Sequence, residues 1–344
     1  MIIPYFGHGE KGTRRPVRAD YSRGGGHRIA GTGGRCAVLE AMLEGWRGRR
    51  VLIVGDRNGL CAFLIAVLEE IGARPICVSD RADAQTLCRA LTAGRIGAAV
   101  LLGEMTGRSL PERLAATLAL TEEIREAGVP LLMALSDAPV YRGSAYRAGE
   151  TERIGGRTRE GLEASILQMA LDGAARGLLG DPVRTLMIRH APILGGQYAA
   201  WCDALLENRA LDVHQPTVRG VFVHPLDVAC CALTLGAAAL QRGEGGVYNL
   251  GTDARNICIH RSAVQRLAAR HHGLSVLHEI EEEGGSPVPL LDGTAMRRLC
   301  GAGCHLDVDQ ALDLLLEQRG AAREGREAEA IRSMTRTYLE DCRA

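Results

Sequence analysis

The strongest constraint on the fold is a regular alternation, between residues 51 and 195, of short apolar runs with longer segments of helical periodicity. Short apolar runs of this kind suit buried parallel strands, and a parallel crossover needs a connection long enough to return the chain to the same end of the sheet. The pattern therefore predicts an α/β fold with a Rossmann-type doubly wound parallel sheet. The predicted strands are 51–54, 75–79, 98–103, 129–136 and 185–195, and the predicted helices are 60–71, 82–91, 110–127 and 158–175.

The pattern is less regular beyond residue 195 and predicts a smaller C-terminal substrate-binding α/β subdomain. Short strands are expected at 220–223 and 247–250, and helices at 228–240, 262–271 and 308–317. Residues 322–342 are rich in Arg and Glu but place Ile331, Met334 and Leu339 on one stripe, which predicts a docking helix. The expected division is a basic Gly/Arg-rich arm at 1–35, a Rossmann-like NAD(P)-binding domain at 36–195 and the smaller subdomain at 196–344, with interleaved C-terminal helices.

Composition excludes several classes of function. The 344 residues are 46% hydrophobic and 24% charged, with a formal net charge of zero, which argues against a nucleic-acid binder or a protein of anionic membranes. The chain has no apolar stretch long enough to span a bilayer, and its first residues lack the apolar core of a secretory signal. These features predict a cytoplasmic protein.

Cysteine and lysine usage limits the available chemistry. The eleven cysteines match neither a zinc nor a redox CxxC framework, so reduced thiols and no metal site are expected. Lys11 is the only lysine, so lysine chemistry in the body of the protein is excluded. His224 precedes a proline in a strand-to-turn motif and is interpreted as a packing or capping residue.

A glycine-containing turn follows the first predicted strand, where a dinucleotide fold binds pyrophosphate on backbone N–H groups at a helix N-terminus. Aligned with GxxGxxG, Gly55 fits, while Asn58 and Cys61 occupy the second and third glycine positions. A shift of one residue uses Gly59 instead, and Leu60 then begins the helix. The side chain at Cys61 is expected to crowd the contact between helix and sheet.

An acidic residue and a basic residue end the second predicted strand. The Asp80 carboxylate could accept hydrogen bonds from the adenosine ribose hydroxyls, which slightly favours NAD, whereas Arg81 leaves room for the phosphate of NADP. The alternative is an ordinary strand-ending turn. The dinucleotide function itself could have been lost.

Three motifs in the second half, at residues 186–195, 218–229 and 246–251, resemble those of the NAD-dependent epimerase/dehydratase family, the extended short-chain dehydrogenases. Residues 186–195 resemble the family's RPxNxYG, residues 218–229 resemble RDFVHVDDVA, and residues 246–251 resemble GxYNxG. The three occur in the family's order, and the resemblance covers about residues 50–320. It implies substrate-binding roles for Arg189, Arg219 and Asn249, with Arg219 a bidentate donor to a nucleotide diphosphate.

The resemblance also locates the catalytic positions, and there the residue types differ. The family uses a Tyr and a Lys in YxxxK with an assisting Ser or Thr. The YxxxK positions fall on Gly155 and Arg159, and the assisting hydroxyl falls on Asp137, with Ser136 one residue earlier. Glycine carries no proton, and the pKa of arginine is too high for proton relay. Tyr146 could replace the missing tyrosine.

These observations leave three hypotheses open. The first is a family member that binds a nucleotide, nucleotide sugar or other small molecule without the usual hydride transfer. The second is an active nucleotide-sugar epimerase, dehydratase or reductase whose acid/base residues have moved. The third is a non-catalytic scaffold that forms a homodimer or pairs with a homologue. None of the three requires nucleic acid or a membrane.

Overall fold

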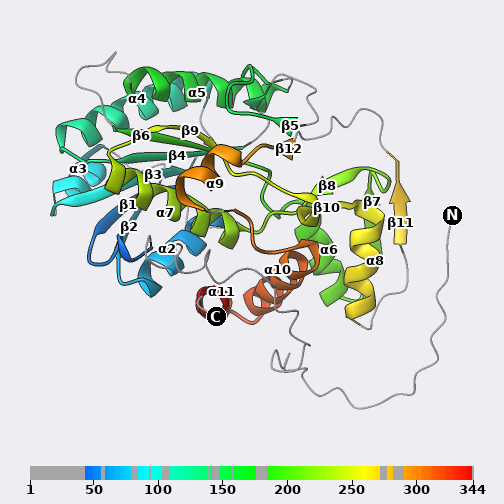
Figure 1. Ribbon diagram of the computed structural model, residues 1–344. Helices are drawn as coiled ribbons and strands as arrows, with labels where there is room; N and C mark the ends of the chain where they lie inside the picture. Colours follow the sequence, from blue (N-terminus) through cyan, green and yellow to red (C-terminus); the bar gives the residue numbers. More distant parts are fainter. Residues whose placement is uncertain are drawn as a thin grey trace.

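The structure, a computed structural model, describes most of the chain from Leu43 onward (Figure 1). The described residues are 43–55, 59–79, 84–92, 94–102, 109–137, 140–141, 147–156, 158–175, 184–271, 277–281, 290–301 and 303–342. The predicted arm at 1–35 lies outside them.

A six-stranded parallel sheet forms the centre of the molecule. Its strands are β1 (Arg50–Val54), β2 (Arg74–Val78), β3 (Ile96–Leu102), β4 (Leu132–Asp137), β6 (Thr185–His190) and β9 (Gly246–Asn249). They lie in the order β2-β1-β3-β4-β6-β9. The chain places β2 on one side of β1 and then crosses to the other side, where β3 pairs with β1 and the later strands follow outward. This arrangement confirms the predicted Rossmann-type α/β fold.

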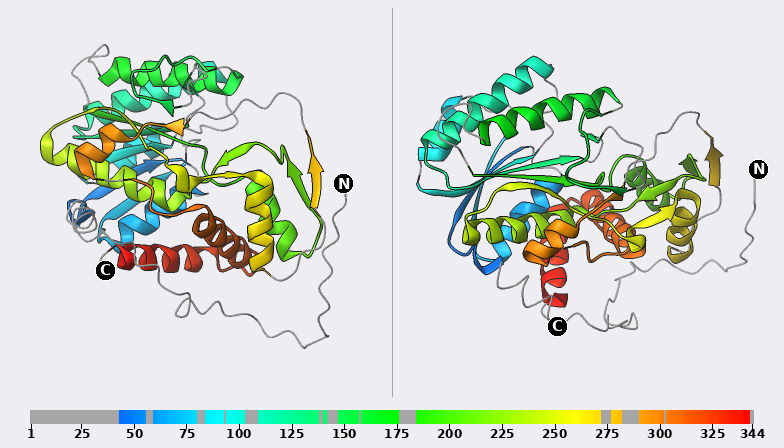
Figure 2. Two further views of the ribbon diagram at one scale, coloured as in Figure 1. Left: turned by 45° about the vertical axis from the view of Figure 1, so that its right-hand side comes forward. Right: turned by 45° about the horizontal axis from the view of Figure 1, so that its top comes forward.

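Helices cover both faces of this sheet (Figure 2). The first face carries α2 (Leu60–Glu70), α7 (Pro225–Arg242), α9 (Thr294–Cys300) and α11 (Glu327–Asp341). The opposite face carries α3 (Ala84–Thr92), α4 (Leu110–Glu126) and α5 (Arg159–Ala175). Each predicted helix of the first half therefore exists, with ends that differ by at most two residues from the prediction.

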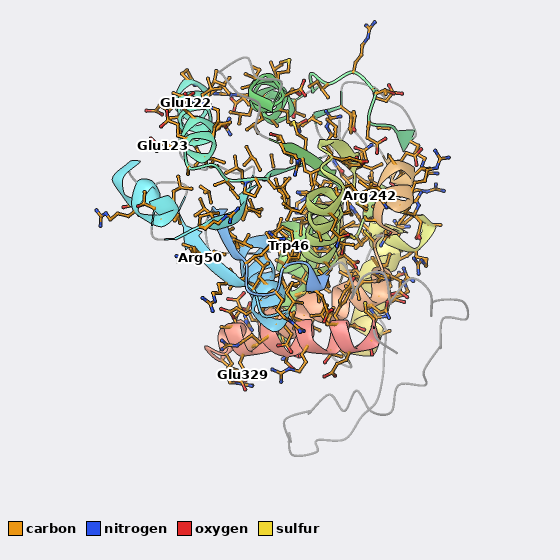
Figure 3. All side chains as sticks on the ribbon, turned by 60° about the vertical axis from the view of Figure 1, so that its left-hand side comes forward. Trp46, Arg50, Glu122, Glu123, Arg242 and Glu329 are labelled. Carbon is orange, nitrogen blue, oxygen red and sulfur yellow. The ribbon has the colours of Figure 1, made fainter. Side chains whose placement is uncertain are left out.

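Alternating strand residues build the two cores. On β1, Val51 and Ile53 face α2 and α7, whereas Leu52 and Val54 face α4. Successive side chains of a strand point to opposite faces, so a strand that is apolar throughout requires helices on both sides. The first core also holds Trp46, which is fully buried and donates its indole N–H to the Leu233 carbonyl of α7 at 2.8 Å (Figure 3).

Segments from beyond residue 195 complete the large sheet. β9 pairs in parallel with β6, and α7 packs beside α2. The expected docking helix is α11, whose Ile331, Met334 and Leu339 are buried against the first face. The chain thus leaves the sheet after β6 and returns to it, so residue 195 does not divide the sheet.

A smaller lobe lies beside the sheet and has its own core around Trp201, Phe222 and Leu315. It contains α6 (Gln197–Leu206), α8 (His260–Arg270) and α10 (Val308–Arg323) with two short pairs of strands, β7 (Leu211–His214) with β11 (Leu277–Ile280) and β8 (Arg219–Val221) with β10 (Ile257–Ile259). A third pair, β5 (Arg147–Ala148) with β12 (Leu290–Leu291), belongs to a separate small core with Val140 and Tyr141.

No helix within the described ranges is both long and apolar enough to cross a bilayer.

Candidate functional site

The carboxyl ends of β4, β6 and β9 carry a cluster of hydrogen-bonded polar side chains. Arg189, the fifth residue of β6, is 5% exposed. Its Nε donates to Gln168 Oε1 on α5 at 2.9 Å, and its Nη1 donates to the Tyr141 hydroxyl at 2.9 Å and to the Glu150 carbonyl at 3.4 Å. Gln168 in turn donates to the hydroxyl of Ser136. One guanidinium therefore connects the β4 end, α5 and the segment that follows β5.

Asn249 closes the cluster from the β9 side. It is fully buried, accepts a hydrogen bond from the Tyr141 hydroxyl at 2.5 Å, and donates through Nδ2 to the Ala148 carbonyl at 2.9 Å. Its backbone N–H donates to Glu150 Oε1 at 3.0 Å. The sequence analysis selected Ser136, Arg189 and Asn249 from separate motifs, and the structure brings them into one network.

Tyr141 lies at the centre of this network, with the Arg189 guanidinium carbon 5.0 Å from the centre of its ring. Burial raises the pKa of Tyr141, and the hydrogen bond and positive charge of Arg189 oppose the rise without cancelling it. The phenol is therefore neutral at physiological pH and serves as both donor and acceptor. A cation over a tyrosine ring also stabilises the pair by about 0.5–2 kcal/mol.

Three members of the cluster, Tyr141, Gln168 and Glu150, were not selected from the sequence as site residues. Gln168 lies on the stripe of α5 that also holds Leu167 and Leu171, and a polar side chain within an apolar helical stripe is the signal that identifies it. Glu150 is half-buried and accepts from the Asn249 backbone.

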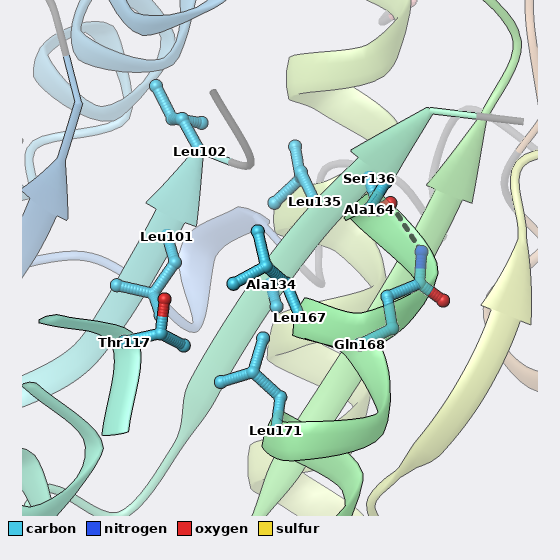
Figure 4. Close-up of a pocket in the computed structure, with 10 residues that line it drawn as sticks. All are labelled: Leu101, Leu102, Thr117, Ala134, Leu135, Ser136, Ala164, Leu167, Gln168 and Leu171. Carbon is cyan, nitrogen blue, oxygen red and sulfur yellow. Dashed lines mark hydrogen bonds between the residues drawn. The ribbon is translucent and has the colours of Figure 1, made fainter. Parts of the chain in front are cut away.

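A small cavity of about 50 Å³ lies beside the cluster, between β3, β4 and the helices α4 and α5 (Figure 4). Ser136 and Gln168 lie at one end of it, and the other lining side chains are Leu101, Leu102, Thr117, Ala134, Leu135, Ala164, Leu167 and Leu171. Pockets for small-molecule ligands are typically about 300–1,000 Å³, so this space is far too small for a nucleotide or a sugar.

The positions that the resemblance assigns to YxxxK lie at the start of α5. Gly155 has φ +137°, and its N–H donates to the Val140 carbonyl at 2.8 Å and to Ser165 Oγ at 3.0 Å. Arg159 is the first residue of α5; its side chain is 87% exposed and pairs with Glu163 at 2.9 Å. Asp137 ends β4, but its side chain is outside what the structure describes, as is Tyr146.

The glycine turn lies at the carboxyl end of β1, as predicted. Gly55 follows the strand and donates to the Val78 carbonyl of β2 at 3.0 Å, and Gly59, with φ +50°, precedes Leu60 at the start of α2. A Cβ at position 55 would lie 2.9 Å from Leu102 Cδ1 and 3.0 Å from Leu102 Cβ, so Leu102 would have to shift to accommodate it. Asn58, Asp80 and Arg81 lie outside the described residues.

Arg219 lies in the smaller lobe, in surroundings unlike those of Arg189. It begins β8 and is exposed. The next residue, Gly220, has no space for a side chain, because a Cβ there would lie 2.5 Å from His260 Nε2 and 2.7 Å from the Tyr198 hydroxyl. His260 and Tyr198 thus pack directly behind the strand that presents Arg219.

The motif that contains His224 begins α7. His224 accepts the backbone N–H of Leu226 through Nδ1 at 3.2 Å, which confirms the prediction of a capping residue. Burial lowers its pKa to about 3, so the imidazole is neutral. Within the described part of the chain, no group of His, Cys, Asp and Glu residues has an arrangement that could hold a metal ion.

Sequence comparison identifies no relative: no protein-family model matches the chain, and no curated protein matches it significantly. Solved structures, in contrast, match it over most of its length. A UDP-glucose 4-epimerase from Thermotoga maritima with UDP-glucose has a TM-score of 0.65 at 17% identity, covering 80% of this chain and 99% of that chain. A UDP-glucose 4-epimerase from Brucella ovis in complex with NAD has a TM-score of 0.65 at 17% identity, covering 77% and 96%.

An NAD-dependent NDP-hexosamine 5,6-dehydratase of tunicamycin biosynthesis matches equally well, with a TM-score of 0.65 at 16% identity and coverage of 82% and 99%. The protein therefore has the fold of nucleotide-sugar epimerases and dehydratases, and the fold expected from the resemblance is confirmed. At these identities the likeness establishes the fold and not the chemistry.

Proposed function

We propose that the chain is a member of the epimerase/dehydratase family that binds a dinucleotide or a nucleotide sugar and lacks the family's Tyr/Lys hydride transfer. The observation that carries the proposal is the backbone at Gly155. A φ of +137° is a conformation that residues with a Cβ rarely adopt. The segment is thus built around glycine at the position where the resemblance expects the catalytic tyrosine.

The following residue supports the same interpretation. Gly156 has φ +36°, and a Cβ at this position would lie 2.2 Å from the backbone of Gly161 in the first turn of α5. Both glycine N–H groups are bound by the Val140 carbonyl. A single substitution of Gly155 by tyrosine would not restore the family's geometry, because the backbone at Gly156 lies directly against the first turn of α5.

The lysine position has also lost its function in this proposal. Arg159 extends toward solvent and is paired with Glu163. Since arginine stays protonated at any physiological pH, it cannot give up and regain a proton during a reaction. It supplies only a positive charge at the surface of α5.

Among the described residues, Tyr141 comes nearest to a relocated catalytic tyrosine, but its hydrogen bonds and its pKa do not suit a catalytic base. Its hydroxyl is used by Arg189 and Asn249, and its pKa is raised, whereas a tyrosine base needs a lowered pKa. Its role in our proposal is to hold the carboxyl ends of β4, β6 and β9 together. Tyr146 remains the tyrosine that the alternative would use.

The expected ligands follow from two separate features, the glycine turn and Arg219. The glycine turn offers N–H groups at the start of α2, where a dinucleotide pyrophosphate would bind, and we expect NAD in preference to NADP. Exposed Arg219 offers its guanidinium for the diphosphate of a nucleotide sugar. The matched solved structures that contain NAD and UDP-glucose support this choice of ligands.

Calorimetry on the purified full chain tests the proposal. NAD, NADP and UDP-, GDP- and dTDP-sugars are titrated separately, and each pair of ligands is then incubated with the protein and analysed by chromatography for an altered sugar nucleotide. We expect binding without turnover, and weaker sugar-nucleotide binding in Arg219→Met but not in the control Arg242→Met, an exposed arginine at the end of α7 (Figure 3). Turnover that disappears in Tyr146→Phe would establish relocated catalysis instead.

A specific observation also supports assembly with a second copy or a homologue. Leu162 and Met169, which are 49% and 54% exposed, are separated by two helical turns on the outer side of α5. We expect the protein to be a dimer through this helix, and the double variant Leu162→Glu/Met169→Glu to be monomeric in light scattering. A wild-type monomer at high micromolar concentration would eliminate the homodimer and leave pairing with a homologue as the form of the scaffold hypothesis.

A further inference from the structure

Two thiols meet beneath the glycine turn. Cys61, the second residue of α2, is fully buried, and its sulfur lies 3.5 Å from that of Cys77 on β2. The Cys77 thiol also donates to the Gly55 carbonyl at 3.7 Å. The pair therefore connects the first turn of α2, the strand beside β1 and the residue that opens the glycine turn.

The two cysteines differ in their access to solvent. Cys77 is partly exposed, whereas Cys61 is covered completely. An oxidant in solution would therefore reach Cys77 first, and Cys61 would be the nearby thiol that resolves the product. Redox-sensitive pairs combine an accessible thiol with a resolving partner in this way.

We propose that Cys61 and Cys77 form a reversible disulfide when the protein meets a peroxide. Cys77 is oxidised first: its sulfur takes the terminal oxygen of hydrogen peroxide to give a sulfenic acid, and one water leaves. The Cys61 sulfur then attacks the Cys77 sulfur, expels the hydroxyl as a second water and closes the S–S bond. Two thiols and one peroxide become one disulfide and two waters, and a small dithiol reverses the reaction.

The bond would change the glycine turn. Disulfide sulfurs lie about 2.0 Å apart, so the sulfurs must approach each other by about 1.5 Å, through rotation of the two side chains and movement of the first turn of α2 toward β2. The Gly55 carbonyl would also lose its thiol donor. This consequence rests on the proposed function: if N–H groups of this turn bind pyrophosphate, oxidation should weaken dinucleotide binding about tenfold.

Peptide mapping tests the linkage without any ligand. The full chain is exposed to hydrogen peroxide, unfolded in iodoacetamide, and digested with trypsin and a glutamate-specific protease. Trypsin alone leaves both cysteines in one peptide, because Arg74 precedes proline, and cleavage after Glu70 separates them. We expect the two fragments to remain joined and to separate with dithiothreitol. In Cys61→Ser, dimedone should label Cys77, because the sulfenic acid has no resolving partner.

A matched control is Cys258, which is also partly exposed and whose sulfur accepts from Arg266 at 2.7 Å. The Cys258→Ser variant should form the Cys61–Cys77 linkage as wild type does. Full alkylation of both Cys61 and Cys77 after peroxide, with dimedone absent from Cys77 in Cys61→Ser, would overturn the proposal. Because the linkage is read by mass, reduced protein that fails to bind NAD would reject the dinucleotide part of the proposed function and leave this result unaffected.

Discussion

Arg189 and Arg219 both come from motifs of the same resemblance, yet the structure gives them opposite surroundings. Arg189 is buried, and its donors are directed to Gln168, Tyr141 and the Glu150 carbonyl. Arg219 is exposed at the start of β8. A motif thus identifies an arginine at a site, but only its partners decide whether its donors hold the protein together or remain available to a ligand.

The largest expected effect separates these two roles directly. Arg189→Met should lower the free energy of unfolding by about 3 kcal/mol, because it leaves several buried polar groups without their donor. Arg219→Met should change it by less than about 0.5 kcal/mol, as expected for an exposed side chain. Urea unfolding followed by tryptophan fluorescence measures both, since Trp46 and Trp201 are buried in different cores. Equal destabilisation by the two variants would contradict the comparison.

The backbone at Gly155 gives the next largest effect. Gly155→Ala should destabilise the protein by about 1–3 kcal/mol, because alanine must adopt a φ of +137°. Gly149, which has open space around its Cβ position and no positive φ, is the control, and Gly149→Ala should have little effect. If Gly155→Ala were as stable as wild type, the backbone argument against a tyrosine here would lose its basis.

A smaller effect is expected for the phenol that Arg189 contacts. Tyr141→Phe retains the ring beneath the guanidinium but removes the hydroxyl shared with Asn249 and Arg189, which should cost about 1–2 kcal/mol in unfolding free energy. Chemical denaturation of this variant measures the loss. A double-mutant cycle with Arg189→Met should show strong coupling, whereas a cycle with Arg219→Met should be additive.

The smallest effect concerns pH. The pKa of Tyr141 is raised by burial, so the folded protein favours the neutral phenol. The stabilisation that comes from the neutral phenol is therefore complete below the pKa of tyrosine in the unfolded chain, near 10. It is lost as the pH rises through the pKa of Tyr141 in the folded protein. Difference absorbance between wild type and Tyr141→Phe should show tyrosinate appearing only above that unfolded value. Removing the opposing charge in Arg189→Met should raise the pKa further, and a fall would show that burial is not the dominant cause.

The positions of the main elements and of several site residues could be predicted from the sequence, but the direction in which a buried side chain donates could not. The strands and helices of the sheet were predictable because burial on both faces imposes continuous apolar runs, as in β1 and β6. The motifs also identified Ser136, Arg189 and Asn249, which the fold gathers into one cluster. The direction of the Arg189 donors was not predictable, because it depends on Gln168 and Tyr141 from other elements. The positive φ at Gly155 was not predicted either, because it depends on contacts such as the hydrogen bond from its N–H to Ser165 of α5.

The packing of α11 on α2 has a consequence for how the protein is made. Glu70 at the end of α2 pairs with Arg336 of α11 at 3.3 Å, across 266 positions of sequence. Similarly, the indole N–H of Trp46 donates to a carbonyl that is made much later, that of Leu233 on α7. On the ribosome, the first strand and helix therefore emerge long before the segments that cover them, and their apolar side chains remain in water or on a chaperone in the meantime. Residues 327–341 are made after the other elements that form the first core, so a chain that stopped before them would leave that core partly uncovered.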